Sequence, residues 1–185
     1  LLDAYTVRSA LGRTGGLDGL RMAIVGDVKH SRVARSTIAA MRLLGVHVTV
    51  VAPRTLLPPD AGDSFADAVT DRLDDVIGDI DVLYLLRMQQ ERMNEALVPS
   101  LREYTARFGL TPQRASALPS QVLIMHPGPM NRGVEIAVDP AELPGAVITR
   151  QVTNGIAVRM AVLFDLLGSG SVARVSDIIT EGGSQ

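Results

Sequence analysis

The sequence predicts an α/β fold in which helices flank an open, mostly parallel β-sheet. Short apolar runs, of which residues 22–25 (MAIV) are the first, alternate with segments whose apolar residues recur at helical spacing. Such unbroken runs are typical of parallel strands that are buried on both faces. Hydrophobic residues make up 46% of the 185 residues and aromatic residues only 3%, so aliphatic side chains must fill the core, which suits an α/β protein.

The first part of the chain is predicted to alternate between helix and strand. Residues 1–11 have helical spacing, and glycines close this segment before a strand begins at residue 21. Ser31 is a suitable N-cap for a helix over residues 31–44, because its hydroxyl can accept a hydrogen bond from a backbone N–H of the first turn. Gly45 ends this helix, and residues 46–52, which are rich in β-branched side chains, form the second strand.

The middle of the chain is predicted to hold one more buried strand between weaker elements. Residues 69–71 are a candidate short edge strand, and residues 73–80 are a short helix dense in aspartate. Residues 81–86 have the composition of a third buried strand. Residues 91–109 favour a polar helix broken by Pro99, and residues 109–120 are predicted to be a connection. This polar excursion is of the kind that closes over a site.

The end of the chain is predicted to contain one strand and one long helix. Residues 122–125 form the fourth main strand, residues 145–150 a linker, and residues 151–167 an amphipathic helix. Residues 169–185 are rich in glycine and serine and are expected to be a flexible tail. The buried side of the helix is predicted to contain Ile156, Val158, Met160, Ala161, Leu163 and Phe164.

Composition excludes several classes of function. A net charge of −2 argues against a nucleic-acid surface. The absence of cysteine excludes disulfides, thiolate nucleophiles and cysteine zinc sites, and the three histidines are too far apart in sequence for a metal cluster. No apolar run is long enough to cross a bilayer, and no signal peptide leads the chain. A cytoplasmic protein without metal or cofactor is therefore expected.

Polar side chains gather where the predicted strands end. Parallel strands place their carboxyl ends at one edge of the sheet, where open α/β folds bind ligands. The loop after residue 25 is mostly cationic and leads into a helix N-terminus, which favours an anion site. Polar loops of this kind are also common without any ligand, so the loop alone leaves both interpretations open. It lacks the glycine spacing of a dinucleotide or P-loop fingerprint. The four polar strand ends are residues 29–32, 53–54, 87–89 and 126–129.

Two arginines at different strand ends suit a small dicarboxylate. The guanidinium of each arginine could clamp one carboxylate through two parallel hydrogen bonds. Ser31 lacks the Gly-x-Ser-x-Gly context of an activated serine, and no catalytic triad is recognisable. The pattern favours a reaction that is catalysed by positioning and charge stabilisation.

Four segments, IVGDVKHSRVARS, LLRMQQERM, MHPGPMNRGVEI and NGIAVRMAVLFDLL, resemble the aspartate-binding domain of bacterial aspartate carbamoyltransferases. The resemblance covers residues 1–167 and implies a Rossmann-like fold, that of the aspartate/ornithine carbamoyltransferase C-terminal domain. It divides the chain into an aspartate-binding domain over residues 1–168, of which residues 1–12 are an inter-domain helix, and a tail. The implied reaction converts carbamoyl phosphate and L-aspartate to N-carbamoyl-L-aspartate and phosphate, a step of pyrimidine biosynthesis.

The resemblance also implies roles for individual residues. Arg32 would bind one aspartate carboxylate, and Arg87 and Gln89 would serve the other carboxylate and the closing loop. The backbone of Pro127 and Gly128 would meet the reacting amine and carbamoyl group, which makes these two residues the catalytic candidates. The expected supporting residues are Lys29, His30, Ser31, Arg54 and His126.

The family's carbamoyl-phosphate domain, with its Ser-Thr-Arg-Thr loop, has no counterpart in this sequence. The chain is therefore expected to be half of an enzyme that acts as a homotrimer of full-length chains, and a dihydroorotase or a regulatory chain remains open as a further partner. Two alternatives remain. One is a non-catalytic amino-acid-binding or assembly module of the same fold. The other is a carbamoyltransferase for another amino acid, which Arg87 and Gln89 disfavour. The ornithine-specific sister family has His-Cys-Leu-Pro where this chain has residues 126–129.

Overall fold

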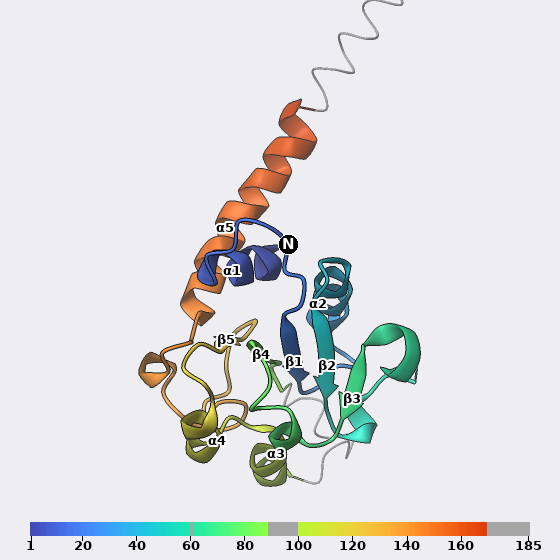
Figure 1. The fold of residues 1–185 in the computed structure, drawn as a ribbon, viewed down its shortest axis with the longest axis vertical. Helices are drawn as coiled ribbons and strands as arrows, with labels where there is room; N and C mark the ends of the chain where they lie inside the picture. Colours follow the sequence, from blue (N-terminus) through green and yellow to red (C-terminus); the bar gives the residue numbers. More distant parts are fainter. Residues whose placement is uncertain (60, 89–99, 170–185) are drawn as a thin grey trace, which may run out of the picture.

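A five-stranded parallel sheet forms the centre of the protein (Figure 1). The computed structural model describes residues 1–59, 61–88 and 100–169. Strand order is β3-β2-β1-β4-β5, and each neighbouring pair is parallel. This confirms the predicted α/β class, including the short edge strand. The strands are β1 (Arg21–Val25), β2 (His47–Val51), β3 (Ala68–Thr70), β4 (Val82–Leu85) and β5 (Leu123–Met125).

The order of the strands reverses between β1 and β4. From β1 the chain adds β2 and β3 on one side, and then returns to add β4 and β5 on the other. Loops that leave β1 and β4 at their carboxyl ends therefore diverge, and the crevice between them is where open α/β sheets bind ligands.

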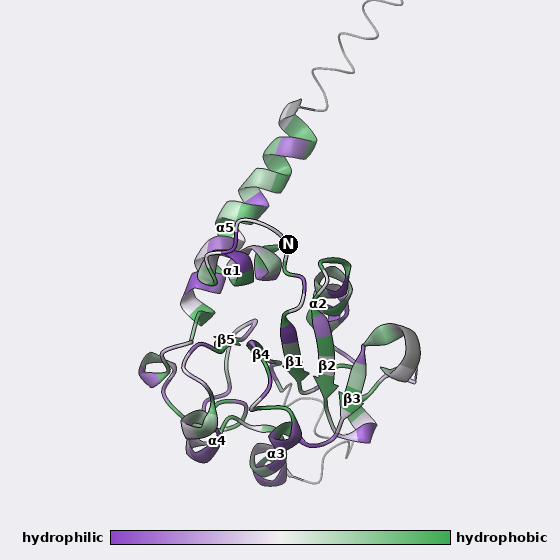
Figure 2. Ribbon diagram, viewed as in Figure 1, coloured by the Kyte–Doolittle hydropathy of each residue, from purple (hydrophilic) through white to green (hydrophobic). Residues whose placement is uncertain are grey.

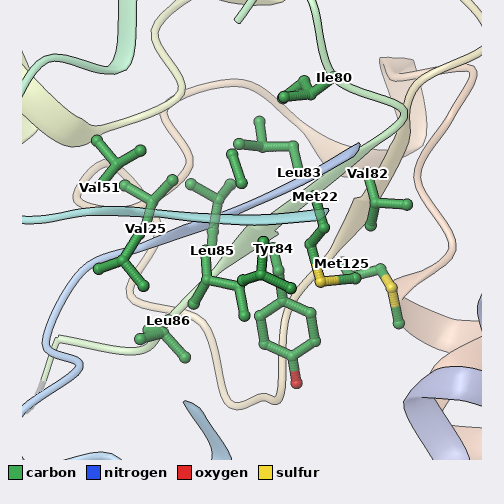
Figure 3. Close-up of a cluster of buried hydrophobic side chains, with 14 of the residues drawn as sticks. Met22, Val25, Val51, Ile80, Val82, Leu83, Tyr84, Leu85, Leu86 and Met125 are labelled. Carbon is green, nitrogen blue, oxygen red and sulfur yellow. The ribbon is translucent and has the colours of Figure 1, made fainter. Parts of the chain in front are cut away.

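Aliphatic side chains fill the core around the two central strands. Residues 22–25 of β1 and all of β4 are buried, as expected for strands covered on both faces. Figure 3 shows the Tyr84 ring beside Met22 and Met125, with its hydroxyl directed away from the aliphatic cluster. Tyr84 is fully buried, so this hydroxyl must find its hydrogen-bond partners inside the protein.

Helices flank the sheet and begin at recognisable caps. Ser31 is the predicted N-cap, and its Oγ accepts a hydrogen bond from the backbone N–H of Ala34 at 3.0 Å. Ser100 and Thr111 cap the next two helices in the same way. The α-helices are α1 (Leu2–Ala10), α2 (Arg32–Leu43), α3 (Leu101–Phe108), α4 (Pro112–Ala117) and α5 (Ile148–Phe164). Helix α1 packs against both α2 and α5.

Three local predictions were wrong. The predicted helix over residues 73–80 is only a 3-10 helix, Leu73–Asp75, followed by a turn that contains Gly78, a residue that disfavours helix interiors. The predicted connection over residues 109–120 contains α4, where the Thr111 cap and Pro112 at the first helical position start a helix despite the low apolar content. The predicted linker over residues 145–150 is partly helical, because α5 begins at Ile148.

The predicted buried side of α5 was also wrong. Within α5 only Ile148 and Gln151 are buried, whereas Ile156 is 60% exposed, Met160 65% and Phe164 76%. The physical reason is visible in Figure 1, where α5 packs against α1 but its C-terminal end extends beyond the body of the protein. Figure 2 shows that this projecting part carries many hydrophobic residues. Helical spacing therefore identified an apolar face but not whether this chain covers it.

Two predictions from the sequence concern segments that lie wholly or partly outside the described residues. The flexible tail over residues 169–185 falls almost entirely there, and residues 91–99 of the polar excursion fall wholly there. The expected inter-domain helix over residues 1–12 corresponds to α1. No helix in the described part of the chain is long and apolar enough to span a membrane.

Candidate functional site

A cavity of about 370 Å³ lies where the loops that follow β1, β4 and β5 meet. Five of its lining residues belong to the segment between β1 and the first turn of α2, one follows β4, and two follow β5. Three strand ends that are far apart in sequence therefore converge, as the parallel sheet predicts. The cavity is lined by Asp27, His30, Ser31, Arg32, Val33, Arg87, Pro127 and Gly128.

The loop after β1 is folded by a short internal network. The Asp27 carboxylate accepts a hydrogen bond from the backbone N–H of His30 at 3.2 Å, and one of its oxygens lies 2.9 Å from His30 Nδ1. Gly26, at the start of this loop, has φ +123°, a conformation that side chains rarely adopt. The loop therefore presents His30 at the cavity in a fixed position.

The N-terminal turn of α2 forms one wall of the cavity. Ser31, Arg32 and Val33 all line it, and Ser31 satisfies only one N–H of the turn, that of Ala34. The first N–H groups of a helix have no partner within the helix, and the helix dipole places partial positive charge there. Arg32 adds a full charge at the same place. This wall is suited to an anion.

Arg87 brings a second guanidinium to the same cavity from the end of β4. Its Nε is buried and has no hydrogen-bond partner among the described residues. The adjacent backbone is held firmly, because the Glu135 carboxylate accepts hydrogen bonds from Met88 N–H and from Asn131 Nδ2. Asn131 Nδ2 also donates to the Met88 carbonyl at 2.7 Å. Arg87 thus has a fixed backbone and a buried donor without a partner among the described residues, an arrangement suited to binding an anion.

The loop after β5 is organised by His126, which is fully buried. Its Nδ1 accepts a hydrogen bond from the backbone N–H of Gly128 at 2.9 Å, so the ring is neutral with its proton on Nε2. Burial, and to a smaller extent the charge of Arg87, lower the pKa of His126 to about 4. Gly128 has φ +65°, and the Gly128–Pro129 peptide is cis. Pro127 and Gly128 therefore reach the cavity on an irregular backbone.

The low pKa of His126 predicts a pH-dependent contribution to stability. Between pH 6.5 and about 4 the unfolded chain binds a proton at this residue and the folded chain does not, so stability falls as pH falls through this range. We expect a loss of roughly 3 kcal/mol, nearly complete at pH 4. Urea unfolding of the wild type and of His126→Asn, whose amide oxygen can accept from the Gly128 N–H, should diverge over this range. Parallel stability profiles for the two proteins would contradict the prediction.

The structure brings together six of the predicted site residues: Arg32, Arg87, His30, Ser31, Pro127 and Gly128. Three others do not line the cavity. Lys29 is half-buried, with its backbone N–H donating to the Leu56 carbonyl; Arg54 is exposed in a 3-10 turn; and His126 faces a neighbouring cavity of about 330 Å³. Gln89 lies outside the described residues.

Sequence reasoning missed one residue that lines the cavity, Asp27, and three that support its loops. Asp27 stands directly at the end of β1, and its spacing of three from His30 was a usable signal. Glu135 and Asn131 join the loop after β5 to the loop after β4 through hydrogen bonds with the Met88 backbone. Gln151 accepts a hydrogen bond from His126, the first residue of the loop after β5. Gln151 stands among other polar residues in the first turns of α5, so no sequence signal singled it out.

Catalysis by a metal or an activated serine finds no support in the described residues. They contain no group of three or more His, Cys, Asp or Glu that could hold a metal ion. The Ser31 hydroxyl accepts from the helix N-terminus, and no base among the described residues is hydrogen-bonded to it. A larger hollow of about 620 Å³ lies beside α2 and the start of β2, away from the carboxyl ends of the strands. Its Asp67 carboxylate is already paired with Arg42 and the Val48 N–H.

The sequence matches the family model "Aspartate/ornithine carbamoyltransferase, Asp/Orn binding domain" over residues 18–166. Among curated proteins it is 53% identical over 173 residues to the aspartate carbamoyltransferase catalytic subunit of Acidothermus cellulolyticus, covering 94% of this chain and 52% of that one. The corresponding subunit of Thermobifida fusca is 50% identical over 174 residues, covering 94% and 54%. The chain thus spans about half the length of the curated relatives it matches.

Solved structures agree. The catalytic subunit of M. jannaschii aspartate transcarbamoylase superposes with a TM-score of 0.75 at 34% identity, covering 92% of this chain and 55% of that one. Aspartate transcarbamoylase from Trypanosoma cruzi, in complex with N-(phosphonacetyl)-L-aspartic acid, gives a TM-score of 0.73 at 29% identity, with coverage of 88% and 53%.

Proposed function

Because the chain belongs to the aspartate/ornithine carbamoyltransferase family, we propose that it is the aspartate-binding half of an aspartate carbamoyltransferase. The enzyme would transfer the carbamoyl group of carbamoyl phosphate to L-aspartate in pyrimidine biosynthesis. One observation carries the proposal. Arg32 and Arg87 line one cavity of about 370 Å³ from different strand ends, next to the backbone of Pro127 and Gly128.

The two guanidiniums fit the two carboxylates of aspartate. Arg32 lies on the anion-favouring wall at the start of α2, and Arg87 brings a buried Nε that has no partner within the described residues. Each can form two parallel hydrogen bonds with one carboxylate. A cationic side chain such as that of ornithine would meet like charge at Arg87. This supports a dicarboxylic substrate over the other amino acids that the family accepts.

The Pro127–Gly128 backbone would hold the reacting groups in place. In the proposed reaction the neutral amine of aspartate attacks the carbamoyl carbon and a C–N bond forms. The C–O bond to phosphate breaks, and phosphate leaves with the bonding electrons and takes up the proton that the amine releases. Backbone groups held by the His126 ring can orient the amine without a covalent intermediate. His30 and Ser31 line the cavity as supporting residues, and a role for Gln89 in closing the site remains part of the proposal.

The carbamoyl-phosphate domain would dock on the uncovered face of α1 and α5. Besides Met160 and Phe164 on α5, Leu1 is 79% and Tyr5 42% exposed on the N-terminal segment. Exposed apolar side chains that gather on one surface mark contact surfaces. The matched relatives are about twice as long as this chain and are called catalytic subunits, which supports a second domain and an assembly of several chains. We propose a homotrimer of full-length chains in the cytoplasm, where a protein without cysteine requires no oxidising environment.

Complementation tests the proposal. The chain alone should bind aspartate only at millimolar concentration, about −4 kcal/mol, and should produce no N-carbamoyl-L-aspartate, because a water-excluding site needs both halves. Adding the carbamoyl-phosphate domain of the Acidothermus relative, separately or fused ahead of residue 1, should raise colorimetric product formation at least about tenfold above either part alone. A fusion that folds and binds aspartate without turnover would favour a non-catalytic binding module. Turnover with ornithine instead would overturn the substrate assignment.

A further inference from the structure

A buried polar cluster joins three helices and a strand behind the candidate site. Asp3 of α1, Thr37 of α2, Tyr84 of β4 and Gln151 of α5 meet in it, and the last three are at most 4% exposed. Asp3 Oδ2 accepts from Thr37 Oγ1 at 2.9 Å and from the Tyr84 hydroxyl at 3.2 Å. This hydroxyl is the one that Figure 3 shows directed away from the aliphatic core. Such clusters fix the relative positions of the elements they join, because each member loses its partners if one element moves.

Gln151 connects this cluster to the loop that lines the site. Its Nε2 donates to Asp3 Oδ1 at 2.6 Å and to the Tyr84 hydroxyl at 3.2 Å. Its Oε1 accepts from the backbone N–H of His126 at 3.1 Å. The orientation of the amide is determined by its partners, since the carboxylate requires a donor and the backbone N–H requires an acceptor.

The hydrogen bond from the His126 N–H to Gln151 fixes the backbone where β5 ends and the loop that lines the candidate site begins. Pro127, the next residue, is shared by the walls of the 370 Å³ cavity and of the neighbouring 330 Å³ cavity, and the latter is also lined by Asp3 and Gln151. A movement of α1 against the sheet would thus be transmitted through Asp3 and Gln151 to the backbone that borders the substrate cavity.

We propose that Gln151 is a positioning residue, which makes the placement of the Pro127–Gly128 backbone depend on the packing of α1 and α5. The inference rests on the proposed function, because α1 and α5 carry the surface on which the carbamoyl-phosphate domain would dock. Docking of that domain would complete the cavity. It would also align the loop after β5, which contains Pro127 and Gly128, through the contact between Asp3 and Gln151.

The chain offers a matched control one turn along α5. Asn154 Nδ2 donates to Thr6 Oγ1 of α1 at 2.9 Å, so it also joins α1 to α5. Within the described residues its side chain has no hydrogen bond to residues 126–128. Asn154→Ala should weaken the helix pair without releasing His126. In the 185-residue chain, amide exchange measured by NMR should accelerate at least tenfold at His126 and Gly128 in Gln151→Ala and less than threefold in Asn154→Ala.

Activity provides the second readout in the enzyme assembled with the carbamoyl-phosphate domain. Gln151→Ala should lower kcat/KM for aspartate at least tenfold and leave KM for carbamoyl phosphate within twofold. Asn154→Ala should keep both within threefold. A general loss of folding would reduce the amount of active enzyme, but it would not change kcat/KM for aspartate while leaving KM for carbamoyl phosphate unchanged.

A charge swap tests the contact if Gln151→Ala does not fold. Gln151→Glu places two carboxylates at the 2.6 Å contact with Asp3 and should impair the use of aspartate. The double variant Asp3→Asn, Gln151→Glu restores one amide and one carboxylate at this contact. It also keeps a side-chain oxygen that can accept from the His126 N–H. Recovery of kcat/KM to within fivefold of wild type is expected.

The outcomes separate the two proposals. Absence of turnover in the assembled wild-type enzyme would defeat the proposed function, while amide exchange would still decide the role of Gln151. Equal exchange rates in the Gln151→Ala and Asn154→Ala chains, or failure of the double variant to recover activity in an active enzyme, would overturn the inference.

Discussion

Replacing Arg87 with alanine should lower kcat/KM for aspartate at least about a hundredfold in the enzyme assembled from this chain and a carbamoyl-phosphate domain. Arg87 lines the cavity and its Nε has no partner among the described residues, so its hydrogen bonds are available to the substrate. A charged hydrogen bond is worth roughly 1.5–3 kcal/mol, and a guanidinium can form two with one carboxylate. The loss of two such bonds accounts for a factor of this size.

Arg87→Lys should recover little of this loss, because an ammonium cannot reproduce the planar pair of donors. The matched control is Arg72→Ala. Arg72 also follows a strand, β3, but it is exposed and pairs only with Asp75 at 3.3 Å within the described residues. Steady-state kinetics with each substrate varied separately provide the measurement. If Arg87→Ala kept kcat and KM for aspartate within threefold of wild type, Arg87 would no longer belong to the proposed site.

The Gly26→Ala variant should be destabilised by about 3–5 kcal/mol, enough to unfold a marginal domain. Two causes add. Gly26 has φ +123°, which is costly for any residue with a Cβ, and the added Cβ would lie 2.8 Å from the Tyr104 hydroxyl and 3.2 Å from Leu86 Cβ. Because Tyr104 and Leu86 are buried, neither can move aside cheaply. Urea unfolding of the 185-residue chain measures the effect.

Two further variants separate the causes of this destabilisation. Gly78→Ala adds the same methyl group where nothing lies within 4 Å and φ is not positive, so it should change stability by less than about 1 kcal/mol. Adding Tyr104→Phe to Gly26→Ala removes the closest atom and should recover about 1 kcal/mol, while the backbone penalty remains. A Gly26→Ala chain as stable as Gly78→Ala would show that the loop after β1 tolerates a conformation different from the one described.

Local chemistry was sufficient to predict much of the fold. The apolar runs of β1 and β4 predicted buried parallel strands, and Ser31 predicted the start of α2, because strand burial and helix capping depend on neighbouring residues. The parallel arrangement then predicted that Arg32, Arg87 and the loop after β5 would meet, since the carboxyl ends of parallel strands share one edge.

What only the tertiary structure decided are the contacts between segments that are distant in sequence. Whether the apolar face of α5 is covered depends on where the helix points, and most of it extends away from the body of the protein (Figure 1). Which cationic side chains at the strand ends face the cavity also depends on the surrounding packing, which admits Arg87 and leaves Arg54 outside. The bonds of Glu135 to Met88 and of Gln151 to His126 span 47 and 25 residues, so no local pattern predicts them. Sequence periodicity reports the environment that a side chain needs, whereas the partner that provides it is determined only when the whole chain has folded.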